Sequence, residues 1–408
     1  MKGNIFSELI VAIDIGTTKI CVLVAQQQSD GTLEIVGIGN SPSHGLKKGV
    51  VVDIAKTVQS IKLAVSEAQL MAGCTIDRAC IGISGSHIKS LSSQGVVPIK
   101  RGQISRQDIA NVLAAAQAIA LPEGQQILHV LPHYFVIDGN ERINDPFGMY
   151  GVRLEANVHI ITGGTASAQN LINCCESAGI KVTDIVLEQL ASAAAVLSPD
   201  ERELGVGMLD IGGGTSDLAL YAHGAIRYTH VIPVAGNQFT NDLAVGLQTT
   251  LLEAERIKKE FGSVQEIDND AIINVASLQD GQTHDVWLPE LSGILRPRAT
   301  ELLMMVKQII DSKQLNQTIT AGFVLTGGGS LLDGLVPLAH EILKVPVRIG
   351  RPRLDHTNFI TLTTPLYATG YGLLLHALQK SNTSTDGISG PLVSRMVARM
   401  KSWVSDFF

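Results

Sequence analysis

Residues 206–221, VGMLDIGGGTSDLALY, decide how this chain folds, because residues 9–24, LIVAIDIGTTKICVLV, repeat their pattern. In both stretches an apolar run ends in Asp-Ile-Gly, small and hydroxyl residues follow, and a second apolar run begins. Two strand-like runs around a short turn predict a β-hairpin. The repeat predicts an internal duplication with one such hairpin in each half. Two unrelated hairpins that share a common tripeptide are the alternative.

The segments around the two hairpins strengthen the duplication. After the first hairpin come a strand-like run at 33–39, a helical pattern at 53–71 behind an aspartate, and a short buried strand at 78–84. After the second come a strand at 225–236, a helical region and, much later, the strand that opens GFVLTGGGSLLDGL at 322–335. Both halves therefore predict a β-β-β-α-β order in an α/β protein.

Composition limits the class of protein. With 408 residues, 45% of them apolar, the chain exceeds what one core usually holds, and we expect two lobes. The formal net charge of −7 argues against a nucleic-acid partner. Five cysteines without a CxxC pair indicate buried thiols in a reducing compartment. The N-terminal apolar run is too short for a signal peptide, so we expect a cytoplasmic protein.

Both hairpin turns are candidate phosphate sites, because a strand that ends in aspartate and turns through glycine and threonine directs backbone N–H groups to one place. We expect Asp14 and Asp210 to face the water shell of a metal ion. The other candidate ligands of a phosphate chain are the turn residues Gly16, Thr17, Thr18 and Lys19 in the first half and Gly212, Gly213, Gly214 and Thr215 in the second.

A third glycine run, Gly327, Gly328, Gly329 and Ser330, follows a predicted strand, and there the missing side chains let backbone lie against a flat ring or a ribose. The sequence contains neither GxGxxG nor GxxxxGK[ST] at these places, so the dinucleotide and P-loop folds lack their defining residues. A nucleotide between two lobes is the prediction.

The strings AIDIGTTK, MLDIGGGTSD and VLTGGGSLLDGL resemble, in order, the two phosphate motifs and the adenosine motif of the actin/Hsp70 and sugar-kinase superfamily. The resemblance implies an actin-like (ribonuclease H-like) two-lobe fold that binds ATP and Mg²⁺. DIVLEQLASAAAVL resembles the first connecting helix, which nominates Glu188 as the residue that positions the attacking water. The resemblance therefore implies three catalytic residues, Glu188, Asp14 and Asp210. A carboxylate favoured by the helix dipole is the alternative.

Two further helices carry the same resemblance. LLEAERIKKEFG resembles the helix that touches ribose and adenine, which nominates Glu255, Lys258 and Lys259; a solvated charged face is the alternative. TPLYATGYGLLL resembles the second connecting helix, in which small residues such as Gly370 and Gly372 permit close packing at the hinge.

The tail predicts a membrane anchor. Residues 379–391 are polar and read as a flexible linker, and residues 392–408 form an amphipathic helical pattern with Arg399 on its cationic side. A helix packed on its own domain is the alternative. The apolar side, expected to enter anionic lipid, comprises Leu392, Val393, Met396, Val397, Met400, Trp403, Val404, Phe407 and Phe408.

SGSHIKSLSSQGVVPI at 84–99, NDPFGMYGVRLEANVHIITG at 144–163 and RPRATELL at 296–303 resemble the FtsA family of bacterial division proteins. That resemblance implies a protein with weak or no ATP hydrolysis, bound peripherally to the cytoplasmic face of the inner membrane at the division septum. It also implies self-polymerisation, anchoring of FtsZ filaments and recruitment of later division proteins. A soluble ATPase or a sugar-kinase-like phosphotransferase is the alternative; a chaperone needs a further domain.

The expected organisation follows from this resemblance. Arg296 and Arg298 are candidate partner-facing charges or members of an internal salt bridge. The domain bounds are 1–84, 163–204 and 363–378 for the first actin-like subdomain (1A); 85–162 for an inserted interaction subdomain (1C); 205–237 and 319–362 for the second actin-like subdomain (2A); 238–318 for a second insertion (2B), which would contact FtsZ; 379–391 for the linker; and 392–408 for the membrane helix.

Overall fold

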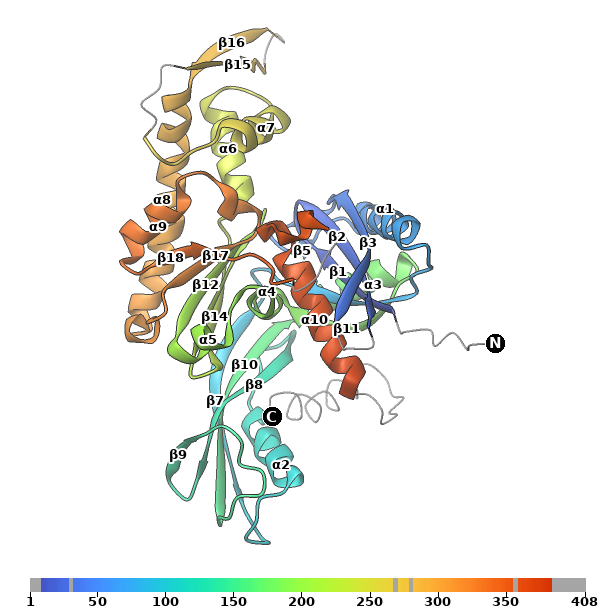
Figure 1. The fold of residues 1–408 in the computed structure, drawn as a ribbon, viewed down its shortest axis with the longest axis vertical. Coiled ribbons are helices and arrows are strands. Elements are labelled where there is room, and N and C mark those ends of the chain that lie inside the picture. Colours follow the sequence, from blue (N-terminus) through green and yellow to red (C-terminus); the bar gives the residue numbers. More distant parts are fainter. Residues whose placement is uncertain (1–8, 29–31, 267–270, 279–281, 355–358, 384–408) are drawn as a thin grey trace.

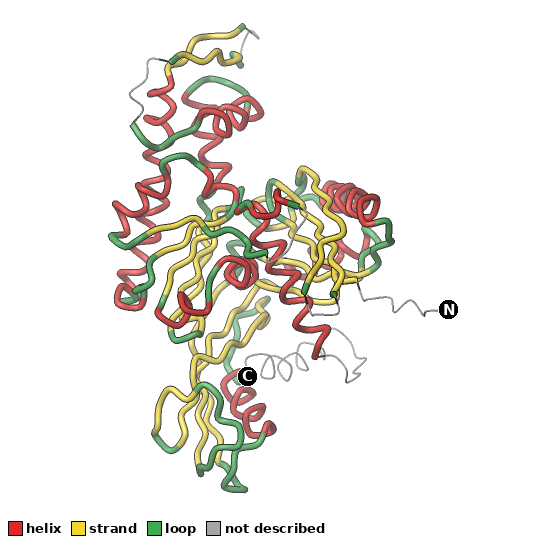
Figure 2. The backbone as a smooth tube through the Cα atoms, in the orientation of Figure 1, coloured by secondary structure: helices red, strands yellow, loops and turns green. Residues whose placement is uncertain are grey.

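The computed structural model describes residues 9–28, 32–266, 271–278, 282–354 and 359–383. Figures 1 and 2 show two lobes side by side, with a mainly helical extension above the second lobe and a small sheet domain below it. The predicted membrane helix, residues 392–408, lies outside the described residues.

The first lobe is built on a five-stranded sheet in the order β11-β6-β1-β2-β3. The first predicted hairpin is present, since β1 pairs antiparallel with β2, and β1 also pairs in parallel with β6. Its central strands are apolar on both faces because helices cover both sides. The strands are β1 (Leu9–Ile15), β2 (Lys19–Gln27), β3 (Leu33–Pro42), β6 (Arg78–Ile83) and β11 (Lys181–Leu187).

The second lobe repeats this sheet in the order β14-β13-β12-β17-β18. As in the first lobe, the hairpin strands β12 and β13 are antiparallel and β12 has a parallel neighbour, β17. The predicted duplication is therefore confirmed. The strands are β12 (Val206–Ile211), β13 (Ser216–Ala222), β14 (Ala225–Ile232), β17 (Phe323–Thr326) and β18 (Val347–Ile349).

Helix α1 (Ile54–Ala72) shows how local sequence sets the first lobe. Its N-cap, Asp53, accepts a hydrogen bond from the Lys56 N–H at 3.0 Å, and it ends at Gly73 with φ 63°. It packs closely on β3, where a side chain at Gly39 would overlap the backbone of Ala64. The other helices of this lobe are α3 (Thr165–Ser177), α4 (Glu188–Val196) and α10 (Ala368–Thr383), whereas α5 (Pro199–Leu204) packs on β13 of the second lobe.

Helices α4 and α10 cross between the lobes and pack without space for larger residues. A side chain at Gly372 would overlap the Ala191 carbonyl, so the expected role of small residues at this crossing is borne out. α10 continues past residue 379, where the linker was expected to begin, to Thr383. In its last turns Lys380 Nζ pairs with the buried carboxylate of Asp184 at 2.7 Å.

Residues 89–164 form a separate layer with its own core, seen at the bottom of Figure 1. Its four-stranded antiparallel sheet has the order β7-β10-β8-β9, and one helix covers a face of this sheet. That helix begins with a capping box between Ser105 and Asp108. The elements are β7 (Lys89–Pro98), α2 (Arg106–Gln117), β8 (Gln125–Ile137), β9 (Asn140–Ile143) and β10 (Arg153–Gly164).

The upper extension is held together by helix packing and by ion pairs. Arg298 binds Asp242 through two hydrogen bonds of 2.6 and 3.1 Å and also contacts Glu301, so its charge is used within the molecule. Arg296 contacts the Val264 carbonyl at 3.1 Å. The elements are α6 (Gly236–Gly246), α7 (Leu251–Phe261), β15 (Ile272–Ala276), β16 (Thr283–Trp287) and α8 (Leu288–Ser312), with α9 (Leu335–Leu343) below them on the second lobe.

The remaining short elements are the hairpin β4 (Leu46–Lys47) and β5 (Val50–Val51) and the 3₁₀ turns η1 (Asn316–Thr318), η2 (Gly328–Leu331), η3 (Ile360–Thr363) and η4 (Pro365–Tyr367). All five cysteines are free; Cys74 is partly exposed and the other four are buried. Among the described residues, no helix has the length and apolar character needed to span a membrane.

Candidate functional site

The two Asp-Ile-Gly hairpins end in turns of the same geometry. We call residues 16–19 the first turn and residues 212–215 the second turn. The Gly16 N–H donates to the Lys19 carbonyl at 3.0 Å, and the Gly212 N–H donates to the Thr215 carbonyl at 3.0 Å. Each turn directly follows its aspartate, Asp14 or Asp210, so the two predicted phosphate loops are structural equivalents.

The two turns face each other across the lobes and lie in contact. A side chain on Gly213 would overlap Thr18, and one on Gly214 would overlap Thr17. Glycine is required on the second turn because the first turn already fills the space with threonine methyl and hydroxyl groups. The structure thus brings together the two loops that the sequence nominated, separated by nearly two hundred residues.

Four carboxylates converge beside this contact: Asp14, Glu188, Asp210 and Asp217. The three aspartates are 9%, 6% and 3% exposed, respectively. Burial, offset in part by Lys19 and reinforced by Asp210, raises the pKa of Asp14 to about 6. Burial raises the pKa of Asp217 to about 7, with Asp210 and Asp14 adding to the rise. Such a cluster disfavours full ionisation unless a cation joins it.

Glu188 is positioned by the start of α4 and by the space that a glycine leaves for its side chain. It is the first residue of α4, as the helix-dipole alternative required, and it also points into the cluster. Burial raises its pKa well above the ordinary value, and the charges of Asp14, Asp217 and Asp210 add to the effect. Gly82 on β6 makes room for it, since a Cβ there would lie 3.0 Å from Glu188 Cγ.

Residues that sequence reasoning missed hold the cluster in place. Asp210 accepts hydrogen bonds from Ser192 and, at 3.1 Å, from Thr369. Asp217 accepts from Gln189 Nε2 at 2.7 Å and from Ser84 Oγ at 2.6 Å. A signal was available for two of them: Gln189 and Ser192 are fully buried polar residues three positions apart on the alanine-rich helix α4.

Asp217 was missed although it stood in the motif. In the β12–β13 hairpin it lies directly opposite Asp210, so both side chains project from the same face of the sheet. The corresponding partner of Asp14 in the first hairpin is Cys21. Burial raises the pKa of this thiol to about 12. The first hairpin has this cysteine where the second has a carboxylate, and the second carboxylate from the first lobe is Glu188 on α4.

The third glycine run lies against the end of β12, directly before the second turn. Gly327 has φ 79°, and a side chain there would overlap Asp210; one on Gly329 would overlap Ile211. Gly328 lies next to Leu366 from the other lobe, 3.1 Å from a Cβ position to Leu366 Cδ2. The Ser330 hydroxyl donates to the Gly327 carbonyl at 2.7 Å, so it stabilises its own turn in this structure.

Lys19 points toward the second connecting segment. Its Nζ donates to the Leu366 carbonyl at 2.8 Å and lies 4.3 Å from the centre of the Tyr367 ring. Its charge still lowers the pKa of Asp14. The predicted phosphate-binding lysine thus lies next to the cluster, and its hydrogen bond also connects β2 with η4.

The three charged residues nominated on α7 have different surroundings in the structure. Lys258 reaches the second turn region: its Nζ donates to the Gly236 carbonyl at 3.1 Å, and the Gly236 N–H donates to Gly212. Glu255 pairs with Lys258 at 2.6 Å. The Lys259 side chain is 70% exposed and contacts only the outer oxygen of Glu255 among the ion pairs of the described residues, which fits a solvated face.

The donor set suits a nucleotide with a hydrated divalent ion. No group of three His, Cys, Asp or Glu side chains in the described part of the chain has the geometry of a direct metal site. Mg²⁺ normally keeps several waters and binds through one or two carboxylates plus phosphate oxygens. The buried carboxylates, with raised pKa values, provide the negative charge for such an ion, and the glycine backbones of the two turns provide the N–H groups for phosphate.

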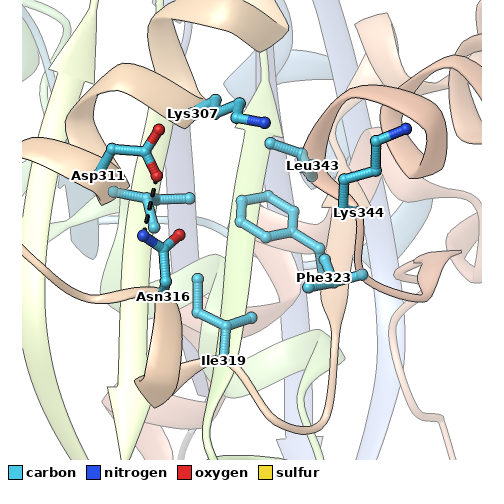
Figure 3. A pocket seen from close by; sticks show the side chains of 9 residues that line it. Lys307, Asp311, Asn316, Ile319, Phe323, Leu343 and Lys344 are labelled. Carbon is cyan, nitrogen blue, oxygen red and sulfur yellow. Dashed lines mark hydrogen bonds between the residues drawn. The ribbon is translucent and has the colours of Figure 1, made fainter.

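The two prominent cavities lie elsewhere. One, of about 380 Å³, lies between the ends of α8 and α9 in the second lobe and is lined by Phe323, Lys307 and Asp311, with Asn316 donating to Asp311 at 2.9 Å (Figure 3). The other lies beside β16 in the extension. Neither is lined by residues of the carboxylate cluster.

Comparison with solved structures fits this architecture. The PilM–PilN type IV pilus biogenesis complex matches with a TM-score of 0.67 at 18% identity, over 90% of this chain and 98% of that one. MreB5 of Spiroplasma citri bound to ADP matches with a TM-score of 0.57 at 16% identity, over 92% and 99%. Together with the repeated sheets and facing turns, these similarities define an actin-like, two-lobed α/β protein, and the expected fold class is confirmed.

Sequence comparison gives the family. The model of the SHS2 domain inserted in FtsA matches residues 85–162, and the model of cell division protein FtsA matches residues 207–372. Cell division protein FtsA of Pseudomonas aeruginosa is 45% identical over 98% of both chains, and that of Escherichia coli is 36% identical over 97% of this chain and 96% of its own. The chain belongs to the FtsA family of cell division proteins.

Proposed function

We propose that this chain is an ATP-binding, actin-like division protein that polymerises at the cytoplasmic face of the bacterial inner membrane, anchors FtsZ filaments there and recruits later division proteins. The observation that carries the proposal is the pair of equivalent turns in contact beside three buried aspartates and Glu188. Membership of the FtsA family supports the division role, and a solved relative in fold, MreB5, is bound to ADP.

In this proposal each part of the site has one task. Asp14 and Asp210 hold the water shell of Mg²⁺, which supplies charge neutralisation for the phosphates. The backbone N–H groups of the two turns and the hydroxyls of Thr17 and Thr18 bind phosphate oxygens. Gly327–Gly329 lie beside the adenosine, and Glu255 with Lys258 contacts its sugar or base from α7. Glu188 orients water if turnover occurs.

Binding requires a change at the contact between the turns. Because Thr17 and Thr18 occupy the space next to Gly213 and Gly214, a phosphate chain must separate these residues to reach both sets of N–H groups. Nucleotide binding would therefore shift the two lobes relative to each other about the close-packed helices α4 and α10. If the bound nucleotide sets the relative position of the lobes, it can thereby control head-to-tail polymerisation.

Membrane attachment in the proposal depends on residues 392–408, whose sequence has one apolar and one cationic side. A single amphipathic helix binds lipid weakly, so polymerisation would supply several tethers at once. In the proposal, the second insertion, residues 238–318, binds FtsZ, and residues 85–162 bind later division proteins. Nucleic acid has no role in this proposal.

The test combines calorimetry with flotation. Full-length protein is expected to bind Mg·ATP in an isothermal titration and to float with vesicles that contain anionic lipid. A truncation after Thr383, which keeps α10 complete, is expected to keep the calorimetric signal and to lose flotation. A full-length protein that ignored such vesicles and turned ATP over rapidly with an added small-molecule acceptor would instead support the phosphotransferase alternative.

A further inference from the structure

The chain enters the sheet domain of residues 89–164 through Ser84 and Gly85, which follow β6 directly. Ser84 is 3% exposed, and its hydroxyl donates to Asp217 Oδ1 at 2.6 Å. Asp217 belongs to the carboxylate cluster and follows the second turn on β13. The entry to the sheet domain is therefore hydrogen-bonded to the second lobe's half of the candidate nucleotide site.

The hairpin β4–β5 connects the same entry to the first turn. Its two turn residues, Lys48 and Gly49, both have left-handed backbone conformations, with φ 51° and 76°. The Gly49 N–H donates to Thr17 Oγ1 at 3.1 Å. Gly49 also packs on the entry, since a Cβ there would lie 2.9 Å from the Ser84 carbonyl oxygen and from Gly85 Cα.

The Thr17 hydroxyl is well suited to sense a ligand in this arrangement. It accepts from Gly49, and its own hydrogen stays available for a phosphate oxygen. A phosphate that draws Thr17 away from Gly214 therefore also pulls on the β4–β5 hairpin. The segment Ser84–Gly85 is thus contacted by Gly49, which is bonded to the first turn, and separately by Asp217, which follows the second turn on β13.

The two chain crossings into the sheet domain, which we call the neck, both contain glycine. The chain enters through Gly85, with φ 133°, and returns through Gly163 and Gly164. His87 lies between the two crossings, 2.9 Å from a Cβ position on Gly85 and 3.5 Å from one on Gly164. Glycine at such positions permits backbone rotation, and so this neck is a site at which the sheet domain can turn.

Beyond the neck, the sheet domain contacts the edge strand of the second lobe. Ser90 Oγ donates to the Thr229 carbonyl at 2.9 Å, and His159 Nε2 lies 2.9 Å from Thr229 Oγ1. Thr229 is on β14, three strands away from β17 in the same sheet. Any rotation at the neck must alter these contacts.

We propose that Ser84 and Gly49 are positioning residues that couple the separation of the two turns to the orientation of the sheet domain. This inference rests on the proposed nucleotide site. When Mg·ATP moves Thr17 away from the second turn, Gly49 and Asp217 move apart. Ser84–Gly85 contacts both residues, so it must either move with Gly49 and lose the hydrogen bond to Asp217 or stay with Asp217 and lose the packing on Gly49. The orientation of the sheet domain, and so the position of its outer surface, thereby depends on whether nucleotide is bound.

The test is amide hydrogen exchange of the full-length protein, measured by mass spectrometry with and without Mg·ATP. Each variant is measured at its own saturating concentration, taken from a separate calorimetric titration, so that a change in affinity does not affect the comparison. In the parent protein we expect Mg·ATP to change exchange by about threefold or more in residues 85–90 and 226–231, as expected for an altered local opening.

Ser84→Ala is expected to lose most of that nucleotide-dependent change, whereas Ser86→Ala, at an exposed position of the same loop, keeps it. Ser90→Ala is expected to keep the change at the neck and to lose it on β14. Calorimetric binding without any exchange response in the parent overturns the coupling alone, and so does a full response in Ser84→Ala. Absence of calorimetric binding in the parent removes the proposed function together with the coupling.

Discussion

Replacing Asp217 by asparagine removes one charge from the carboxylate cluster with almost no change of shape. The Oδ1 of the amide still accepts hydrogen bonds from Ser84 and Gln189, which the parent carboxylate accepts at 2.6 and 2.7 Å. We therefore expect Asp217→Asn to stabilise the protein without nucleotide and to weaken its stabilisation by Mg·ATP. The substitution keeps the packing, but it removes the charge and the hydrogen bond that the Thr215 hydroxyl donates to Asp217 Oδ2 at 3.2 Å.

The magnitude follows from the pKa of the carboxyl group. Burial raises the pKa of Asp217 from 3.8 to about 7. At 1.36 kcal/mol for each pKa unit, ionised Asp217 costs the native state about 4 kcal/mol above pH 7. Neighbouring charges relax when one is removed, so an observed gain of about 1–3 kcal/mol is reasonable.

The pH dependence has a definite sign. Between pH 4 and pH 7 an unfolded chain ionises this aspartate while the native state keeps the proton, so native stability falls as pH rises through that window. Asp14, whose pKa burial raises to about 6, adds to the fall. The stabilisation by Asp217→Asn should thus be partial at pH 5 and complete at pH 8.

Thermal unfolding at pH 5 and pH 8, in EDTA and in Mg·ATP, measures these effects. The control Asp77→Asn removes the same charge from a side chain that is 81% exposed, and it should change stability by less than about 0.5 kcal/mol. A lower melting temperature for Asp217→Asn in EDTA at pH 8 would refute the electrostatic reasoning. An unchanged gain from Mg·ATP would remove Asp217 from the nucleotide site.

Three other substitutions test separate parts of the molecule. Asp210→Ala should lower Mg·ATP affinity at least about tenfold in calorimetry without loss of the circular dichroism of the folded protein; unchanged affinity would exclude the second turn. Trp403→Glu should abolish vesicle flotation and leave ATP affinity intact, and equal flotation of variant and parent would contradict the membrane helix. Gly372→Ala should destabilise by about 3 kcal/mol through overlap with Ala191, whereas Gly293→Ala, with no atom within 4 Å of its Cβ position, should be neutral or stabilising.

The parts of the fold that repeat could be predicted from sequence. The Asp-Ile-Gly strand ends gave both hairpins, and the duplication then placed Asp14 and Asp210 in equivalent positions. These inferences depended on patterns within about twenty residues. The turns were expected to face each other, but their direct contact was not foreseen, because it depends on threonine in one turn and glycine in the other.

The parts of the site that were missed depend on long-range packing. Ser84 lies 133 positions from Asp217, and Thr369 lies 159 positions from Asp210, so no local pattern joins them. Lys19 was expected beside phosphate, yet its nearest polar partner in the structure is the Leu366 carbonyl, 347 positions away. Register would have revealed Asp217, since it lies opposite Asp210 across a turn of known length.

The differences between the two halves explain how a duplicated protein obtains an asymmetric site. In register, the turn Gly-Thr-Thr-Lys of the first half corresponds to Gly-Gly-Gly-Thr of the second. Position two of one turn meets position three of the other at both contacts, which is the arrangement of a local two-fold axis. Threonine on both turns would collide, and glycine on both would leave a void and no hydroxyls. The sequences diverged where the two copies touch: the first turn provides two threonine hydroxyls, and the second hairpin has Asp217 opposite its aspartate where the first has Cys21.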